Sequence, residues 1–439
     1  MNEATNSVRE KKDNPSFGAE ITRYIKHLDS LNGMVPLIME LILSKIQQEK
    51  KDIEKFIKDN NVKEEIVEDR KNLLIPEDAF KDFIELNENV EATKIANHFL
   101  PINFAVSFVS QYDAYLGRLI RTIFLAKPQI LNSSERNILF SELLEFKDIN
   151  EAKEFIIDKE VEAVLRDSHF KQFRWIENKV GIKLRENLPS FKKFIEITER
   201  RNLFVHCNGI VSRQYIDTCT EHEINGIEKI KVGDRLHVKA SYLFGCYSIL
   251  FEIGVKLGHV LWRKLLPEQI EDADEHLNNV CFMLLSKGKY NLALNLLTFA
   301  TDILKKHCDQ ETEYIFTINK ALAFHLKDKK EDCEKVISNK DWSAASDKFK
   351  LAISVLNSDY DLASNLMKMI GANHSHVTKD AYRQWPLFKK FRQSTEFKNA
   401  FKEVFEEEFI YVETKPKRLA EIIEEIRSMN VKGESEEPS

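Results

Sequence analysis

Three polar side chains with complementary chemistry, Arg201, Asn202 and His206, stand close together in the segment ITERRNLFVHCNGIVSRQYI, residues 197–216. The imidazole of a histidine gains and loses a proton near neutral pH, so His206 is a candidate general base. An arginine keeps its charge and offers planar, paired donors to an anion, so Arg201 is a candidate anion-binding group. The residue types therefore indicate acid–base chemistry beside a fixed cation.

The spacing of these residues resembles the signature of the HEPN superfamily, an Arg and a His separated by four to six residues with a polar residue directly after the Arg. Spacing alone is a weak signal, because a chain with twelve His and this many Arg contains roughly one or two such pairs by chance. Here the pairs run from Arg200 and Arg201 to the same His206, on a predicted helix that ends at Asn208-Gly209. The string ERRNxxVHxxGxV is similar to a form common in bacterial HEPN proteins, and the resemblance covers residues 95–265.

The resemblance implies a metal-independent endoribonuclease. In such an enzyme His206 would help the RNA 2′-hydroxyl to attack its phosphate, Arg201 would stabilise the charge that develops on the phosphate oxygens, and Asn202 would position a neighbouring group. It also implies a bacterial toxin or antiphage defence effector, with RNA as the substrate of a hydrolase. A homodimer through the HEPN-like domain is implied as well.

The same residues also have a purely structural interpretation. Arg201 would then form a surface ion pair with Glu196 or Glu199, and His206 would cap the C-terminal end of its helix, where a positive charge is favoured. The chain would be a non-catalytic helical adaptor or a dimeric scaffold that binds a protein partner.

The helix geometry favours a site shared between two chains. Five residues turn an α-helix by about 140° and advance it by about 7.5 Å, so Arg201 and His206 do not point into one cleft on a straight helix. Two motif helices that meet across a twofold axis would line a shared groove with the Arg of one chain and the His of the other.

The elements that must position the motif are predicted to be helices, because Gly (13) and Pro (10) are scarce and apolar residues recur at intervals of three and four. The predicted helices cover residues 17–60, 101–124, 190–205 and 241–262. Asp113 lies in the apolar stripe of the second and is interpreted as a solvent-facing or capping carboxylate rather than a site residue.

Residues 210–239 break this helical pattern. Asn225-Gly226 and Gly233-Asp234 are turn dipeptides, and the stretches IEKIKV and RLHVKA alternate like short strands. The pattern predicts a small hairpin or extended insertion directly after the motif.

The C-terminal part resembles a tetratricopeptide (TPR) repeat, in which small residues let paired helices approach closely. The residues that carry this resemblance are Leu285, Gly288, Tyr290, Ala293 and Ala300, followed by a looser match at Ala344, Phe349, Ala352, Asp361 and Ala363. The predicted fold is thus mainly α, a HEPN-like helical bundle followed by a TPR-like helical array that docks an unknown protein partner. The predicted divisions are 1–90 (N-terminal helical region with a disordered start), 91–268 (HEPN-like), 269–430 (TPR-like) and 431–439 (disordered tail).

Charge and composition limit the remaining functions. A net charge of -6 argues against a protein that coats duplex nucleic acid, so contact with RNA is expected at one cleft only. The N-terminus lacks the apolar core of a signal peptide and no membrane anchor is visible, so a cytoplasmic protein is expected. His374 and His376 lack further ligands at a suitable spacing and are interpreted as a loop, so neither a metal nor a cofactor is expected.

Overall fold

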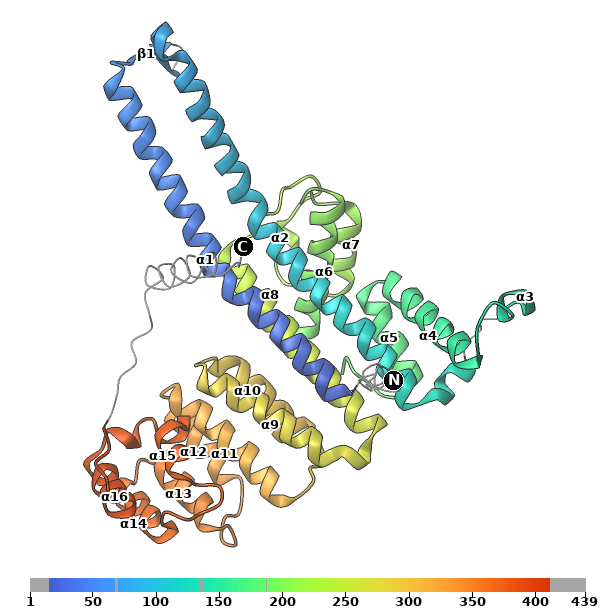
Figure 1. The fold of residues 1–439 in the computed structure, drawn as a ribbon, viewed down its shortest axis with the longest axis vertical. Coiled ribbons are helices and arrows are strands. Elements are labelled where there is room, and N and C mark those ends of the chain that lie inside the picture. The colour runs from blue at the N-terminus through green and yellow to red at the C-terminus, as the bar shows by residue number, and fades with distance from the viewer. Residues whose placement is uncertain (1–15, 68–69, 134–137, 187, 411–439) are drawn as a thin grey trace, which may run out of the picture. The chain divides into compact units, whose positions relative to one another are not determined.

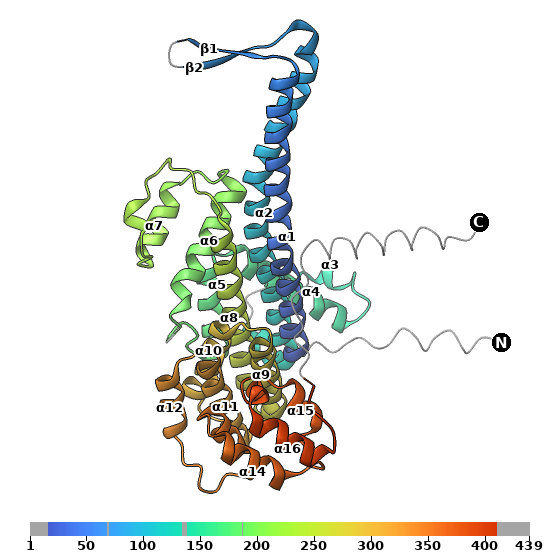
Figure 2. The ribbon, with the colours of Figure 1, turned by 90° about the vertical axis from the view of Figure 1, so that its left-hand side faces the viewer.

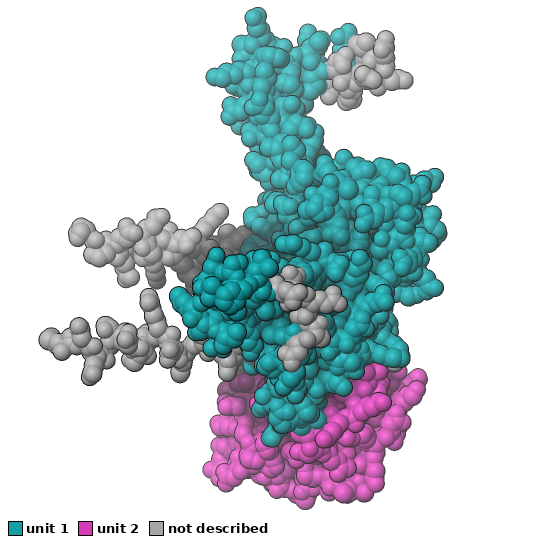
Figure 3. Space-filling view, turned by 90° about the vertical axis from the view of Figure 1, so that its right-hand side faces the viewer, with its two compact units in different colours: residues 1–273 teal, residues 274–439 magenta. Residues whose placement is uncertain are grey.

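A computed structural model describes residues 16–67, 70–133, 138–186 and 188–410 of the chain (Figure 1). The described residues are mainly α-helical, as predicted, with sixteen α-helices and one short β hairpin. They form two compact units that divide in sequence between Ala273 and Asp274 (Figure 3). The division falls within α9 (Ile270–Ser286), whose first residue follows the boundary that the sequence predicts after residue 268.

Unit 1 contains the motif helix and the long helices of the N-terminal half. Its elements are α1 (Phe17–Asp59), β1 (Lys63–Val67), β2 (Arg70–Leu74), α2 (Phe80–Ala126), α3 (Phe140–Leu143), α4 (Ile149–Arg166), α5 (His169–Val180), α6 (Ser190–His206), α7 (Arg213–Glu221) and α8 (Ala240–Leu265). The helices predicted over 17–60, 101–124, 190–205 and 241–262 are confirmed by α1, α2, α6 and α8. Since α2 runs unbroken through residue 90, the boundary predicted there lies inside one helix.

Helices α1 and α2 lie side by side as a long hairpin, and α8 packs against the lower part of both (Figures 1 and 2). Buried residues of α1 recur every seven positions at Leu28, Val35, Ile42 and Glu49, the period of a coiled-coil seam. The buried carboxylate of Glu49 accepts a hydrogen bond of 2.6 Å from the Thr93 hydroxyl, so the polar position in the seam is satisfied.

The base of this hairpin depends on a close approach of α8. The rings of Tyr24 and Tyr115 stack at 4.2 Å, and their hydroxyls donate to the carbonyls of Leu250 and Gly254 at 2.8 and 2.9 Å. A Cβ atom at Gly254 would lie 2.1 Å from the Tyr24 ring, and one at Gly258 would lie 2.4 Å from the Tyr115 hydroxyl. The two glycines therefore allow α8 to pack directly on the tyrosines.

Helix α8 is also apolar along most of its length. It is the one helix in the described part of the chain that is long and apolar enough to cross a membrane, and 67% of its most apolar window is buried within the protein. Buried core helices of soluble proteins share this length and composition.

The hairpin predicted for residues 210–239 is wrong. This segment forms α7, a 3-10 turn (Ile227–Lys229) and an isolated β bridge between Ile210 and Arg235. The alternating apolar residues instead surround a small core, which consists of buried Leu203, Val211, Tyr215, Cys219 and Ile224 with Ile227, Ile230 and Leu236 packed against it. The only strands among the described residues, β1 and β2, pair antiparallel between α1 and α2, where no hairpin was predicted.

Unit 2 is a row of helical hairpins. Its helices are α9 (Ile270–Ser286), α10 (Tyr290–Thr298), α11 (Gln310–Leu326), α12 (Lys330–Ser338), α13 (Asp347–Leu356), α14 (Tyr360–Ile370), α15 (Lys379–Gln384) and α16 (Thr395–Phe405). The short turns between α9 and α10, α11 and α12, and α13 and α14 make the helices of each pair antiparallel, as predicted for the residues after 270. The tail predicted for 431–439 lies outside the described residues.

The three turns of these hairpins share one geometry. Gly288, Asp328 and Ser358 adopt φ values of 71°, 57° and 61°. In each turn the next amide returns to the carbonyl five residues earlier, at 2.9 Å for Lys289, 3.0 Å for Lys329 and 2.9 Å for Asp359. A small side chain, Ala293, Cys333 or Ala363, is buried five residues after each turn. Unit 2 therefore contains a structural repeat that loose sequence spacing only partly reveals.

The close contact at α8 leads to a stability prediction. Replacing Gly254→Ala forces the Tyr24 ring to move, and we expect the free energy of unfolding to fall by about 1–3 kcal/mol. Gly245→Ala on the same helix is the matched control, because a Cβ there meets nothing within 4 Å and alanine favours a helix. Thermal unfolding of the two variants should therefore shift in opposite directions, and an unchanged midpoint for Gly254→Ala would contradict the packing described.

Candidate functional site

Helix α6 carries all three residues of the motif and ends at the last of them. The Gly209 amide donates to the Leu203 carbonyl at 3.0 Å, and Asn208 and Gly209 have φ values of 49° and 75°. The stop predicted at Asn208-Gly209 is confirmed, because this left-handed pair reverses the chain after His206. The imidazole of His206 is consequently exposed at the end of the helix.

A cleft of about 450 Å³ surrounds this end of α6. Its lining residues are Asp113, Leu165, Arg166, Asp167, Ser168, His169, Glu199, Arg201, Asn202, Leu203, His206, Cys207, Ser212, Gln214 and Tyr215. Arg201, Asn202 and His206 all line it within one chain, whereas the helix geometry predicts a poorly converging site on a single protomer. The other walls come from α2, α4, α5 and α7, which surround the C-terminal end of α6.

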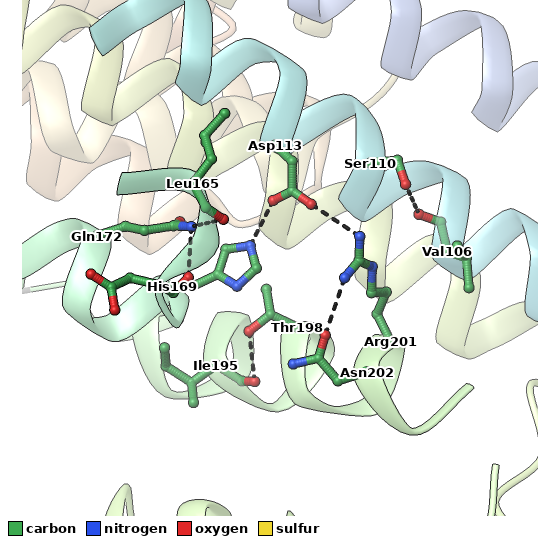
Figure 4. Close-up of polar contacts among 11 residues, drawn as sticks. Val106, Ser110, Asp113, Leu165, His169, Gln172, Ile195, Thr198, Arg201 and Asn202 are labelled. Carbon is green, nitrogen blue, oxygen red and sulfur yellow. Dashed lines mark hydrogen bonds and ion pairs between the residues drawn. The ribbon is translucent and has the colours of Figure 1, made fainter. Parts of the chain in front are cut away.

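Asp113 connects the motif helix to two other helices. One carboxylate oxygen lies 3.3 Å from Nη2 of Arg201 on α6, and the other lies 2.8 Å from Nε2 of His169 on α5 (Figure 4). The interpretation of Asp113 as a solvent-facing or capping carboxylate is therefore wrong. A carboxylate within the apolar stripe of a core helix was the available signal, since such a position requires a partner.

The two consecutive arginines face different surroundings. Arg200 lies 2.6 Å from the buried Glu196 carboxylate, and its guanidinium stacks over the Tyr242 ring at 4.3 Å. Arg201 turns toward the cleft and pairs with Asp113, so the alternative that pairs it with Glu196 or Glu199 is wrong. Arg200 thus stabilises the packing of α6 on α8, and only Arg201 is placed for a ligand.

The guanidinium of Arg201 is only partly engaged. Nη1 donates to the Asn202 side-chain oxygen at 3.2 Å, and Nη2 faces Asp113. Nε has no hydrogen-bond partner among the described residues. An unpaired buried donor is uncommon in a native protein.

Glu199 adds a carboxyl group to the cleft. Burial raises the pKa of Glu199, while the charge of His169 and a hydrogen bond with Asn202 act in the opposite direction. Its side chain is almost completely enclosed, and desolvation disfavours the ionised carboxylate. The cleft therefore contains a carboxyl that keeps its proton to higher pH than an exposed glutamate.

His206 lies in the last turn of α6, where the alternative places it, and its side chain is not tied down by a hydrogen bond from any described residue. The backbone amide of Cys207 closes the last turn of α6 by donating to Leu203 at 2.9 Å, and the described residues provide no hydrogen bond to the His206 imidazole. The ring is therefore exposed at the cleft, where a substrate can reach it.

Metal ligands do not cluster in the part of the chain that the structure describes, where no group of three or more His, Cys, Asp or Glu side chains converges. His374 lies in a loop, as predicted, and its Nδ1 accepts from the amides of His376 and Val377, each at 3.1 Å. This contact gives His374 a local structural role.

A comparison of the chain with protein-family models, curated proteins and solved structures gave no match. The resemblances to HEPN and TPR proteins therefore stay predictions from the residues.

The raised pKa of Glu199 predicts a pH-dependent change in stability. A carboxyl with a folded-state pKa above its unfolded value contributes stability below the unfolded pKa, and this contribution is lost as the pH rises through the folded pKa. Glu199→Gln keeps the shape but cannot ionise, so we expect a higher melting temperature than wild type at pH 8 and no difference at pH 4. Glu221→Gln, at the exposed end of α7, is the control. A Glu199→Gln protein that is less stable at pH 8 would contradict this charge penalty.

Proposed function

We propose that this chain is a metal-independent endoribonuclease of HEPN type. The observation that carries the proposal is the convergence of Arg201, Asn202 and His206 on one cleft, with the cation held by Asp113 and the imidazole exposed. A fixed cation beside an accessible base is the arrangement that phosphodiester cleavage through the 2′-hydroxyl requires.

The proposed reaction needs only side chains. His206 takes the proton of the 2′-hydroxyl, whose oxygen attacks the phosphorus as the bond to the 5′-oxygen breaks. The products are a 2′,3′-cyclic phosphate and, once the leaving oxygen gains a proton, a 5′-hydroxyl. Arg201 stabilises the charge on the non-bridging oxygens, and Asn202 holds the guanidinium through its 3.2 Å contact.

The charges around the cleft favour contact with a single phosphodiester. Arg166 and Arg201 line it together with the carboxyl groups of Asp113, Asp167 and Glu199, so the cleft has no excess of positive charge. A long basic groove would instead increase affinity along an RNA backbone and make it strongly dependent on salt. We therefore expect short RNA segments to bind with weak salt dependence.

Unit 2 supports a second proposed role, as a TPR-like array that docks a protein partner. Its three hairpin turns repeat the same hydrogen bond, and such stacked hairpins provide extended binding surfaces.

A non-catalytic adaptor is the competing function of the chain. One observation favours it, since Asp113 already neutralises Arg201. As an enzyme, the chain would act in the cytoplasm as a toxin or antiphage effector, and its overexpression would arrest growth unless His206 is replaced.

Nuclease activity is tested with purified protein and RNA in EDTA. We expect cleavage that leaves 2′,3′-cyclic or 3′-phosphate ends, because the 2′-hydroxyl is the nucleophile. His206→Ala and Arg201→Ala should each lower the rate by 100-fold or more, on the order of what general acid–base groups and oxyanion donors contribute. Lys192→Ala, on the exposed side of α6, is the control and should cleave like wild type. Strict dependence on Mg²⁺ would exclude this mechanism, and absence of cleavage would favour the adaptor.

We also propose a homodimer through the HEPN-like domain, supported by Val205, an apolar residue that is 47% exposed beside the motif. Light scattering should give twice the 51.3 kDa of the chain. Each cleft already contains both motif residues, so mixing Arg201→Ala and His206→Ala protomers should leave the exchanged dimers inactive. Recovery of activity would instead indicate a composite site across the axis.

A further inference from the structure

The cleft contains a second imidazole, that of His169. This residue is the first of α5, its side chain is largely buried, and it lines the same cleft as Arg201 and His206. Its Nε2 lies 2.8 Å from Asp113, which also holds Arg201 at 3.3 Å through its other oxygen. One carboxylate therefore fixes both the imidazole and the cation on adjoining walls.

We infer that His169, oriented by Asp113, is the second proton-transfer group of the site and protonates the leaving 5′-oxygen. The inference rests on the proposed nuclease function and extends it, since His206 alone accounts only for the proton of the 2′-hydroxyl. Cleavage is faster when an acid supplies a proton as the bond between phosphorus and the 5′-oxygen breaks.

The geometry gives each nitrogen of His169 a separate role. Nε2 is directed at Asp113, while the other ring nitrogen is turned away from it toward α6 (Figure 4). A hydrogen bond of this kind fixes the orientation of the ring. The Asp113 carboxylate also compensates the charge that the ring carries when both nitrogens are protonated. Transfer of the second proton to the 5′-oxygen leaves a neutral ring that remains bound to Asp113.

Aromatic rings hold His169 in this position. Its ring lies 6.0 Å from that of Tyr112 and 5.6 Å from that of Phe194, edge-on to the latter. An imidazole that served only to join α5 to α2 would not need to line the cleft. The combination of enclosure, a carboxylate partner and access to the cleft is typical of a proton-transfer group.

Several other titratable groups face this imidazole. Asp113 and Tyr112 approach from α2, Glu199 from α6, and Arg166 and Asp167 line the cleft beside it at the end of α4. No side chain of α8, which is described throughout, lines the cleft. The pH dependence of cleavage will therefore report the coupled titration of these groups, so a chemical test of the leaving group is the sharper one.

The experiment compares two substrates, an ordinary RNA dinucleotide and the same dinucleotide with sulfur in place of the bridging 5′-oxygen. A thiolate leaves without protonation, so a general acid is needed only for the first substrate. We expect His169→Gln to lower cleavage of ordinary RNA by about 100-fold or more and cleavage of the sulfur substrate by less than about tenfold. His206→Gln should slow both, because both need the 2′ proton removed.

His222→Gln is the matched control, because His222 packs on Phe170 of α5 but does not line the cleft, and this variant should cleave both substrates like wild type. Equal loss of activity on both substrates for a folded His169→Gln protein would overturn the inference in favour of a structural role. No loss of activity on either substrate would overturn it as well.

If His169→Gln does not fold, the pH profiles of the wild-type protein on the two substrates test the inference. In the wild type, the rate of cleavage of ordinary RNA should fall at high pH while the rate on the sulfur substrate does not. Identical pH profiles for the two substrates would refute the role of His169 as a general acid. Failure of the wild type to cleave either substrate would instead refute the nuclease itself.

Discussion

The shared carboxylate of Asp113 is the interaction on which the site depends. It lies on α2 and holds Arg201 of α6 and His169 of α5 on its two oxygens, so three helices contribute to one cluster. Without it, the cation would keep only its contact with Asn202, and the imidazole only its packing against aromatic rings. The carboxylate also offsets the positive charge of Arg201 in the cleft.

Asp113 can act in this way only because α2 is itself held in place. Tyr115, two residues further along α2, donates to the carbonyl of Gly254, and the missing side chains of Gly254 and Gly258 let α8 reach the tyrosine core. Helix α6 packs on the same α8 through the pair of Arg200 and Glu196 beside Tyr242. Helix α8 thus positions both α2 and α6. Of the two adjacent arginines, Arg200 makes a structural contact and Arg201 lines the site.

Unit 2 is built on a different principle. Each hairpin turn repeats the backbone geometry of Gly288, although Asp328 and Ser358 replace glycine in the other two turns. Aspartate and serine adopt the left-handed conformation at a cost that the repeated hydrogen bond offsets. The repeat is therefore preserved in the backbone more clearly than in the residue types, which explains why spacing in the sequence matched only loosely.

The sequence by itself determined the local features: the helices, the end of α6 at Asn208-Gly209, and the acid–base and anion-binding character of His206 and Arg201. These follow from periodicity, backbone conformation and side-chain chemistry, which act over a few residues. Tertiary structure alone decided that Arg201 rather than Arg200 faces the cleft, and that Asp113 and His169 belong to it. These contacts join residues 88 and 56 positions apart, and no local pattern encodes them. The same limit applies to the cleft, because helical angles describe one helix, whereas α2, α4, α5 and α7 supply the walls of the cleft that Arg201 and His206 both line.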